Sequence, residues 1–292
     1  MKILAAVVRE LRPRQYTKNL LVFAGALFAG RLGEPGIFGR AALAFVAFSA
    51  CASAVYVLND ILDAPKDRLH PVKRFRPIAA GELSLPVAWC LLGVLLVFGG
   101  GLGRWLDGRL VWVLGIYFVM NVAYSFWLKH IAIIDVMVIA LGFVLRALAG
   151  VMVIDVEVTS WFVVCVFMLA LFLALAKRRG ELKRLEASGD TENGRRVLAS
   201  YSVPLLNALL VTVLASSLTS YVLFAMQSAG EMFFAGLPEM LLTVPLVVYG
   251  LFRYLLLMDR QGAGERPEEV LLRDQPILFT CIFYAVLVFL IR

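Results

Sequence analysis

Residues 41–67 read AALAFVAFSACASAVYVLNDILDAPKD, and this stretch decides the fold. It begins as an apolar run and ends in a polar segment that contains three aspartates. An α-helix needs about 20 apolar residues to cross the hydrocarbon core of a bilayer. The sequence therefore predicts that residues 37–58 span a membrane and that residues 59–67 follow at the membrane surface.

The rest of the chain has the same apolar character. Of its 292 residues, 61% are hydrophobic and 17% are charged, whereas a soluble domain holds about 45–50% apolar residues. We therefore expect an all-α polytopic membrane protein with nine transmembrane helices in a single transmembrane domain over residues 1–292. The predicted spans are 17–33, 37–58, 84–104, 109–127, 131–151, 158–176, 201–226, 238–257 and 275–291.

The basic residues predict the orientation of these spans. With the N-terminus in the cytoplasm, the cytoplasmic segments hold 21 of the 28 Lys and Arg residues. Those segments are 1–18, 59–83, 128–130, 177–200 and 258–274. Such an excess is typical of cytoplasmic loops. We therefore expect a multi-pass protein of the plasma (inner) membrane that retains its basic leader and carries its functional face in the cytoplasm.

An acidic motif follows the span 37–58. Asn59, Asp63 and Asp67 recur every four residues, so they share one face if the helix continues. Tyr56 lies one turn earlier on that face, and Asp60 is one residue from it. The carboxylates repel one another unless a cation binds, and hard oxygen ligands suit Mg²⁺, which shares its shell with substrate phosphates. The alternative is a solvated loop with scattered charge, but this segment begins at the end of an apolar helix.

Pro65 complicates a regular helix here, and we expect a break or a short new helix near Ala64. Five basic residues accompany the motif: Lys66, Arg68, Lys73, Arg74 and Arg76. Cations neutralise the charge of a diphosphate, and the forked donors of arginine hold its oxygens. The segment therefore indicates a metal–diphosphate site.

Further polar residues lie within or at the ends of the spans. Arg146 lies inside the span 131–151, where an arginine costs at least ~2.5–3.5 kcal/mol on insertion scales. It must face the bundle interior, a water-filled cavity or a partner, and a structural ion pair with Asp155 or Glu157 is the alternative to a binding role. Other candidates are Lys18, Tyr124, Lys129, Lys177 and Arg178, which are otherwise snorkelling lysines, interfacial rings or ordinary flanks of a span. The two histidines and four scattered cysteines exclude a His-rich or Cys-rich metal site.

The pattern Asn-Asp-x-x-Asp-x-x-x-Asp, here Asn59, Asp60, Asp63 and Asp67, resembles the first motif of the UbiA superfamily of intramembrane prenyltransferases. Nine helices also fit that fold, and the resemblance covers essentially the whole chain. One departure is that the second aspartate-rich motif expected after residue 176 is missing, with only Glu181 near that position. Five stretches, in the expected order, resemble the decaprenyl-phosphate phosphoribosyltransferase branch: 12–19, 67–81, 124–130, 145–150 and 177–178.

The resemblance implies an Mg²⁺-dependent membrane transferase that moves 5-phosphoribose from 5-phosphoribosyl 1-diphosphate to a polyprenyl (decaprenyl) phosphate. At the family level, such a product serves cell-wall biosynthesis as an arabinan precursor. The resemblance implies that Asp60, Asp63 and Asp67 are catalytic and that Asn59, Asp63 and Asp67 bind the metal ion. All of them belong to one catalytic domain. The implied substrate-binding residues are Lys18, Tyr56, Lys73, Arg74, Arg76, Tyr124, Lys129, Arg146, Lys177 and Arg178.

Two other classes of protein compete with this interpretation. An ordinary prenyltransferase, which moves a prenyl group from a prenyl diphosphate to an aromatic acceptor, uses the same first motif but also needs the missing second one. A transporter places its charges near the bilayer midplane, whereas these charges gather at one surface. We expect no nucleic-acid partner, and the sequence leaves open a homo-oligomer, the polyprenyl length and the number of Mg²⁺ ions.

Overall fold

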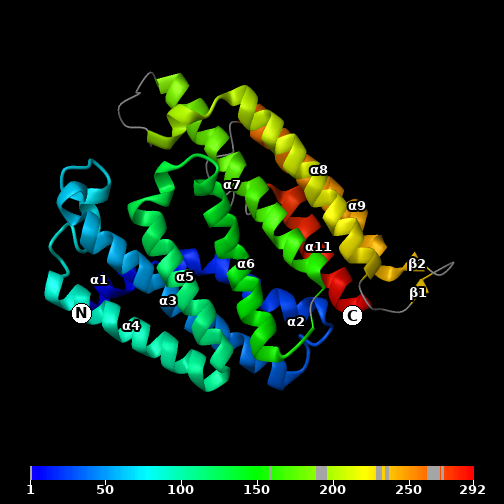
Figure 1. Ribbon diagram of the computed structural model, residues 1–292, viewed down its shortest axis with the longest axis horizontal. Helices are drawn as coiled ribbons and strands as arrows, with labels where there is room; N and C mark the ends of the chain where they lie inside the picture. Colours follow the sequence, from blue (N-terminus) through cyan, green and yellow to red (C-terminus); the bar gives the residue numbers. More distant parts are fainter. Residues whose placement is uncertain are drawn as a thin grey trace. The chain divides into compact units, whose positions relative to one another are not determined.

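The structure is a computed structural model that describes residues 2–157, 159–188, 196–227, 232–233, 237–261, 270 and 273–292. These residues are almost entirely helical (Figure 1). The described residues also include a short antiparallel pair, β1 (Met232–Phe233) with β2 (Leu237–Pro238). The α-helices are α1 (Lys2–Leu11), α2 (Ala24–Phe28), α3 (Pro35–Asp67), α4 (Leu85–Leu106), α5 (Gly108–Phe126), α6 (Ile134–Ile154), α7 (Ser160–Ser188), α8 (Val203–Gln227), α9 (Val244–Gln261) and α11 (Gln275–Ile291). The 3-10 helices are η1 (Pro13–Phe23), η2 (Lys73–Phe75), η3 (Leu128–His130), η4 (Arg196–Ser200) and η6 (Glu239–Thr243).

Seven of the described helical segments are long and apolar enough to cross a membrane, and each coincides with a predicted span. They are α3, α4, α5, α6, α7, α8 and the η6–α9 segment. The predicted span 275–291 forms α11, which has 17 residues. The predicted span 17–33 is not one regular helix, because it begins within η1 and continues into the short α2. The multi-pass all-helical fold is therefore confirmed, while the count of nine spans stays a prediction.

The expected break near Ala64 is wrong. The helix α3 continues without interruption from Pro35 to Asp67, with Pro65 close to its end. A proline removes one helical hydrogen bond and crowds the carbonyl four residues earlier. Only the last turn of α3 bears that cost here, and the Arg68 N–H then closes the helix on the Ala64 carbonyl at 3.2 Å.

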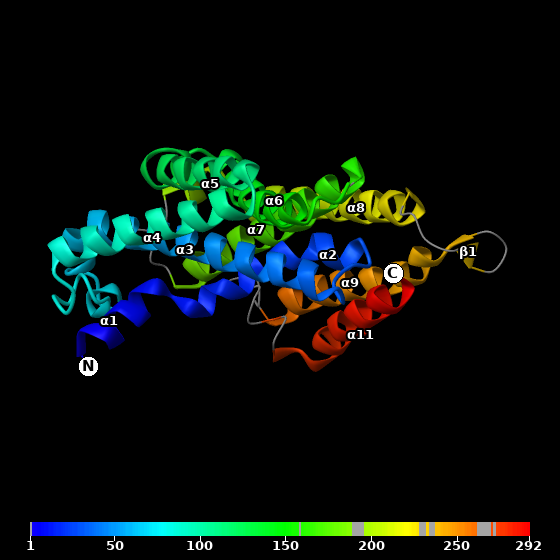
Figure 2. The same ribbon diagram turned by 90° about the horizontal axis from the view of Figure 1, so that it is seen from below.

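The described chain forms two compact units. Unit 1 comprises Met1–Ala26, Gly33–Phe126 and Leu145–Val156. Within it α3 packs along α4, and the two helices lie side by side in both views (Figures 1 and 2). Burial of apolar side chains stabilises this contact, and the buried residues include Ala54, Val57, Ile61, Ala88 and Leu92, with Ile78 and Leu83 from the connecting loop.

Two serines of α3 fix η1 against this helix. The Asn19 amide donates to Ser49 Oγ at 3.0 Å, and the Tyr16 hydroxyl lies 2.9 Å from Ser53 Oγ. Ser53 in turn donates to the Leu11 carbonyl at 2.9 Å. Because Ser49 and Ser53 are four residues apart, they share one face of α3, and η1 follows that face.

A close backbone contact joins η1 to the part of α6 that belongs to unit 1. A Cβ atom on Gly150 would lie 1.8 Å from the Val22 carbonyl oxygen, and one on Gly25 would lie 2.7 Å from a methyl group of Val151. Small residues are what permit membrane helices to approach so closely. Gly150 therefore allows α6 to lie directly against η1, next to the contact between Arg146 and Asn19.

Unit 2 comprises Leu27–Leu32, Trp127–Val144 and Glu157–Arg292, so the two parts of α6 belong to different units. Its principal helix pair is α7 with α8. Burial of large apolar and aromatic side chains holds its helices together, and the core includes Phe172, Leu206, Leu210, Tyr254 and Leu257.

Candidate functional site

One face of α3 carries a continuous stripe of polar side chains. Its members recur at alternating intervals of four and three residues, which is the spacing of a single helix face. Polar groups within a span face the protein interior, so the stripe leads from the serines that hold η1 to the acidic end of the helix. The stripe is formed by Ser49, Ser53, Tyr56, Asp60, Asp63 and Asp67, with Asn59 beside it.

Two aspartates at this end are neutralised by arginines. Arg76 Nη1 donates to Asp60 Oδ1 at 2.9 Å and to Asp67 Oδ2 at 2.7 Å. The Arg12 guanidinium forms a second ion pair with Asp60. Both carboxylates are only 3% exposed, and buried charges are tolerated when they are paired in this way. Asp60, Asp67 and Arg76 are among the predicted residues, whereas Arg12 is an addition from the structure.

Asn59 and Asp63 differ from these neighbours. Both are half-buried, and within the described residues neither side chain forms a hydrogen bond or an ion pair. Being four residues apart on α3, they project from the same face. Their oxygen atoms are therefore not occupied by any group in the described part of the protein.

The residues present fit a magnesium ion that is bound jointly with a substrate. No three His, Cys, Asp or Glu side chains converge as a metal cage in the described part of the chain. Mg²⁺ usually keeps several waters and is held by one or two carboxylates together with substrate phosphates. Asn59 and Asp63 supply such a small set of oxygen ligands. Asp67, the third predicted ligand, is bonded to Arg76 instead.

A further carboxyl group reaches this cluster from α1. Glu10 is 1% exposed, and neither of its oxygens has a hydrogen-bond partner among the described residues. Burial, followed by the negative charge of Asp60, raises the pKa of Glu10 to about 8. The charges of Arg12 and Arg76 act in the opposite direction with smaller effect. Glu10 was not predicted, because a single glutamate in an amphipathic segment belongs to no motif.

The other predicted residues near this end of unit 1 have different surroundings. The Arg12 guanidinium lies over the ring of Tyr56, with 5.0 Å from Cζ to the ring centroid. Lys73 and Arg74 are exposed in η2. Lys18 is half-buried in η1 and donates to Gln15 at 2.7 Å. The structure thus brings Tyr56 to the acidic cluster and places two basic side chains of the following loop in solvent.

Arg146 is buried at the contact between η1 and α6. Its Nε donates to Asn19 Oδ1 at 2.8 Å and its Nη2 donates to the Tyr117 hydroxyl at 2.9 Å. Its guanidinium also lies over the rings of Phe48 and Tyr117, at 5.2 and 4.9 Å. Hydrogen bonds and cation–π contacts stabilise a charge inside a span. Tyr124, also predicted, is half-buried near the end of α5.

The ion pair considered for Arg146 and Asp155 does not form. Asp155 is 85% exposed at its side chain and accepts a hydrogen bond from Arg109 at 2.9 Å. An exposed pair of this kind contributes little stability. A binding role for Arg146 therefore stays a prediction.

Arg178 is the centre of a buried network in unit 2. Its Nε donates to Asp135 Oδ2 and its Nη1 donates to Glu181 Oε2, each at 2.6 Å. The Tyr201 hydroxyl donates to the other Asp135 oxygen at 2.7 Å. Arg178 is 1% exposed and Asp135 is fully buried. The guanidinium that the sequence assigns to phosphate is therefore bonded to two carboxylates here.

Two lysines flank this network. Lys177 precedes Arg178 on α7, and Lys129 lies in η3. Both are half-buried, and neither forms an ion pair or side-chain hydrogen bond within the described residues. Between η3 and α6, Ile133 has a φ of 70°, which a β-branched residue rarely adopts. Its N–H donates to the Tyr201 hydroxyl at 2.6 Å, so the network also fixes the turn that follows Lys129.

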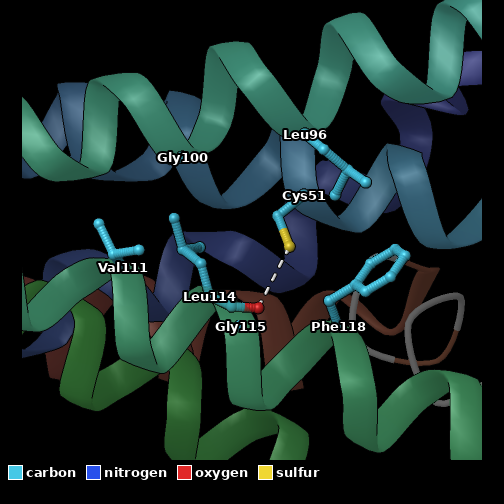
Figure 3. Close-up of a pocket in the computed structure, with 7 residues that line it drawn as sticks. All are labelled: Cys51, Leu96, Gly100, Val111, Leu114, Gly115 and Phe118. Carbon is cyan, nitrogen blue, oxygen red and sulfur yellow. Dashed lines mark hydrogen bonds between the residues drawn. The ribbon is translucent and has the colours of Figure 1, made fainter.

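Unit 1 also contains an apolar hollow between α3, α4 and α5 (Figure 3). Within it the Cys51 thiol donates to the Leu114 carbonyl at 3.5 Å. No charged side chain is among the residues that line it, so it offers nothing to a metal ion or a phosphate. Its lining consists of Cys51, Leu96, Gly100, Val111, Leu114, Gly115 and Phe118.

Several residues of these clusters were absent from the predicted set. Tyr117 and Tyr201 contact charged groups that lie far from them in the sequence, so no local spacing indicates the pairing. The sequence contains one indication of these contacts: a charged residue in an apolar span, such as Asp135, is costly without a partner. This cost predicts that a partner exists but does not identify it.

Solved structures define the class of fold. The chain resembles a UbiA homolog from Archaeoglobus fulgidus bound to GPP and Mg²⁺, with a TM-score of 0.74 and 19% identity over 100% of this chain and 99% of that one. It also resembles a digeranylgeranylglyceryl phosphate synthase, with a TM-score of 0.70 and 16% identity over 98% and 99% of the two chains. The chain therefore has the fold of the UbiA homologs.

Sequence comparison then identifies the family. Residues 19–271 match the model of the UbiA prenyltransferase family, and the chain belongs to that family of transferases. It is 33% identical to the decaprenyl-phosphate phosphoribosyltransferase of Mycolicibacterium smegmatis, over 94% of this chain and 88% of that protein. It is 35% identical to the enzyme of the same name from Corynebacterium glutamicum, over 92% and 81% of the two chains.

Proposed function

We propose that this protein transfers the 5-phosphoribosyl group from 5-phosphoribosyl 1-diphosphate to a polyprenyl phosphate, with release of diphosphate. The observation that carries the proposal is the 33–35% identity to decaprenyl-phosphate phosphoribosyltransferases over 92–94% of the chain. The excess of basic residues in the segments that bear the site supports an active site that faces the cytoplasm. All of residues 1–292 would serve this one catalytic domain.

The donor diphosphate would bind at the acidic end of α3. Asn59 and Asp63 would hold Mg²⁺, which, when bound, neutralises charge on the leaving diphosphate. Asp60 and Asp67 orient Arg76 through the two hydrogen bonds described above. The exposed Lys73 and Arg74 of η2 would bind the 5-phosphate of the donor, and Tyr56 would contact the ribose.

The acceptor brings its own nucleophile to the reaction. An oxygen of the lipid phosphate forms a bond to the anomeric carbon of the ribose. The bond from that carbon to the diphosphate oxygen breaks, and its electron pair leaves with the diphosphate. The acceptor oxygen is already ionised, so no strong general base is required. Lys18, Tyr124, Lys129, Arg146 and Lys177 would orient the anionic groups, with Arg178 holding the end of α7 in place.

The end of α7 argues against an ordinary prenyltransferase. That reaction calls for a second acidic motif after this span, and Glu181 is the acid nearest to the expected position. Its carboxylate is already bonded to the Arg178 guanidinium at 2.6 Å. Asp190 and Glu192, which follow in the sequence, lie outside the described residues. The geometry of α7 therefore supports anion binding by lysines more than a second acid-bound metal.

The test uses purified protein in detergent with Mg²⁺, labelled 5-phosphoribosyl 1-diphosphate and a polyprenyl phosphate. Label should enter the lipid fraction, and the transfer should disappear with EDTA and in Asp63→Ala. Asp155→Ala removes an exposed carboxylate elsewhere in unit 1 and should leave transfer unchanged. Failure to label the lipid, combined with turnover of a prenyl diphosphate and an aromatic acceptor, would overturn the proposal in favour of prenyl transfer.

A further inference from the structure

The helix α1 has two unlike faces. Ile3, Leu4 and Val8 are exposed apolar residues, as in a helix that rests in the membrane interface. Ala6 and Glu10, which are four residues apart, are buried where α1 contacts α3. Figure 2 shows α1 beside the loop that joins α3 to α4. The buried face of α1 therefore delivers a carboxyl group to the acidic end of α3.

Glu10 is the unusual member of this buried face. The oxygens of a carboxyl group can accept hydrogen bonds, yet those of Glu10 accept none within the described residues. Buried polar groups nearly always have a partner, and an exception calls for a functional explanation. The nearby arginines do not supply one, because Arg12 is bonded to Asp60 and Arg76 joins Asp60 to Asp67.

The donor substrate offers the groups that Glu10 lacks. Its phosphates are anionic acceptors and require cations, which arginines, lysines and a metal provide. The hydroxyl groups of its ribose ring are hydrogen-bond donors, and they require acceptor oxygens. Glu10 and Asp60 place two carboxyl groups next to each other at the end of α3. This pair suits a sugar diol and is of no use to a phosphate.

We propose that Glu10, assisted by Asp60, binds the ring hydroxyls of the ribosyl donor and selects a sugar diphosphate over a prenyl diphosphate. The inference rests on the proposed function. A prenyl diphosphate has no hydroxyl group, so its binding leaves the buried Glu10 oxygens without a donor. Sites that hydrogen-bond a substrate hydroxyl discriminate strongly against analogues that lack it, because the polar groups of the site stay unpaired.

The experiment is a cycle of variants and donor analogues measured by binding. Isothermal titration in detergent with Mg²⁺ gives the Kd of 5-phosphoribosyl 1-diphosphate and of its 2-deoxy and 3-deoxy analogues. Wild-type protein should bind at least one deoxy analogue about 5- to 100-fold more weakly than the parent donor, as expected when a buried acceptor is left without its hydrogen-bond donor. In Glu10→Ala, the parent donor and the same deoxy analogue should bind with equal Kd. The side chain that contacts the hydroxyl group is then absent, so removal of the hydroxyl group costs no further affinity.

Two further variants keep the test decisive. Glu10→Gln retains the size of the side chain and should show a smaller loss of affinity for the deoxy analogue even where Glu10→Ala does not fold. Glu82→Gln is the control: it removes an exposed carboxylate that pairs with Arg9, the residue before Glu10 on α1. In this variant the loss of affinity for the deoxy analogue should equal that of wild type. An undiminished loss of affinity for the deoxy analogue in both Glu10 variants, or its absence in Glu82→Gln, would overturn the inference. Wild-type protein that does not bind the parent donor would instead refute the proposed function.

Discussion

The acidic end of α3 and the charged end of α7 contain the same residue types in opposite balance. At the end of α3, carboxyl groups outnumber their arginine partners, and Asn59 and Asp63 have no partner among the described residues. At the end of α7, the buried Arg178 is bonded to two carboxylates. Among the described residues there, the half-buried Lys129 and Lys177 form no ion pair or side-chain hydrogen bond.

This difference shows which groups serve the structure and which remain for a ligand. In each region the charges that are deeply buried in an ion pair are Asp60 and Asp67 in unit 1 and Asp135 and Arg178 in unit 2, and pairing is what makes their burial tolerable. The groups left over in unit 1 are the half-buried Asn59 and Asp63 and the buried Glu10, and in unit 2 they are the half-buried ammonium groups of Lys129 and Lys177. Oxygen ligands bind a hard cation, and ammonium groups bind an anion. Each region is therefore fitted to one charged component of the proposed reaction.

The largest expected effect comes from breaking the pairing in unit 2. Arg178→Ala leaves the fully buried Asp135 without its cation, which should reduce the free energy of unfolding by ~3–5 kcal/mol. The measurement is denaturant unfolding in detergent. Arg178→Met combined with Asp135→Leu removes both charges and should recover much of the loss. A stable Arg178→Ala protein that has lost only activity would show that Arg178 is a ligand and that the comparison fails.

The next effect tests the unpaired acid of unit 1. Asp63→Asn should lower the rate of transfer by about 10²–10³-fold, because it weakens the stabilisation of developing charge on the leaving group. Its unfolding curve should match wild type, because Asp63 forms no hydrogen bond or ion pair with any residue that the structure describes. Raised Mg²⁺ should restore part of the activity. Asp155→Asn is the matched control, and equal losses in both variants would remove Asp63 from the site.

A smaller effect should follow from an unpaired cation of unit 2. Lys177→Ala should raise the KM of an anionic substrate by about 10- to 100-fold, the value of one charged hydrogen bond, with no change in stability. Initial rates at varied donor and acceptor would reveal which substrate it contacts. Lys183→Ala, further along the same helix, is the control. A loss of stability in Lys177→Ala would place this lysine with Arg178 among the structural groups.

The spans could be predicted from the sequence because the bilayer fixes their length and composition. The first predicted span departs from this rule. Its path is set by Ser49 and Ser53 and by the contact at Gly150, and these tertiary contacts cannot be read from a local pattern. The continuation of α3 through Pro65 was also missed: the proline removes one helical hydrogen bond and crowds the Ile61 carbonyl, but only two residues of the helix follow it.

The candidate site was predictable only where its chemistry is local. The acids of α3 stand three or four residues apart, and that spacing alone indicates a shared face. The partners are not local: Arg12 reaches Asp60 from the junction between α1 and η1, and Arg178 reaches Asp135 across 43 residues. A sequence with many acids and bases permits numerous pairings, and packing decides among them. Glu10 shows the limit, because only its burial distinguishes it from an ordinary surface glutamate.

The smallest expected effect concerns an ion pair that lies neither at the end of α3 nor at the end of α7. The Asp274 carboxylate caps α11 by accepting the Ile277 N–H at 3.0 Å, and it pairs with Arg253 at 2.9 Å. Its replacement by alanine should cost ~1 kcal/mol of stability at neutral pH, as for other lost caps. Activity per folded molecule should be unchanged, which sets the baseline for an ion pair without a role in the reaction.

The pH dependence of stability tests whether the charge of Asp274 is responsible for this effect. The hydrogen bond from Arg253, followed by that from the Ile277 N–H, lowers the pKa of Asp274 below its ordinary value. The carboxylate therefore stabilises the folded protein fully above the unfolded pKa of ~3.9, and this contribution is lost as the pH falls through the lower folded value. Unfolding measured between neutral pH and about pH 3 should thus converge for wild type and Asp274→Ala at the acid end. Parallel curves over that interval would mean that the cap acts through packing and not through the charge of Asp274.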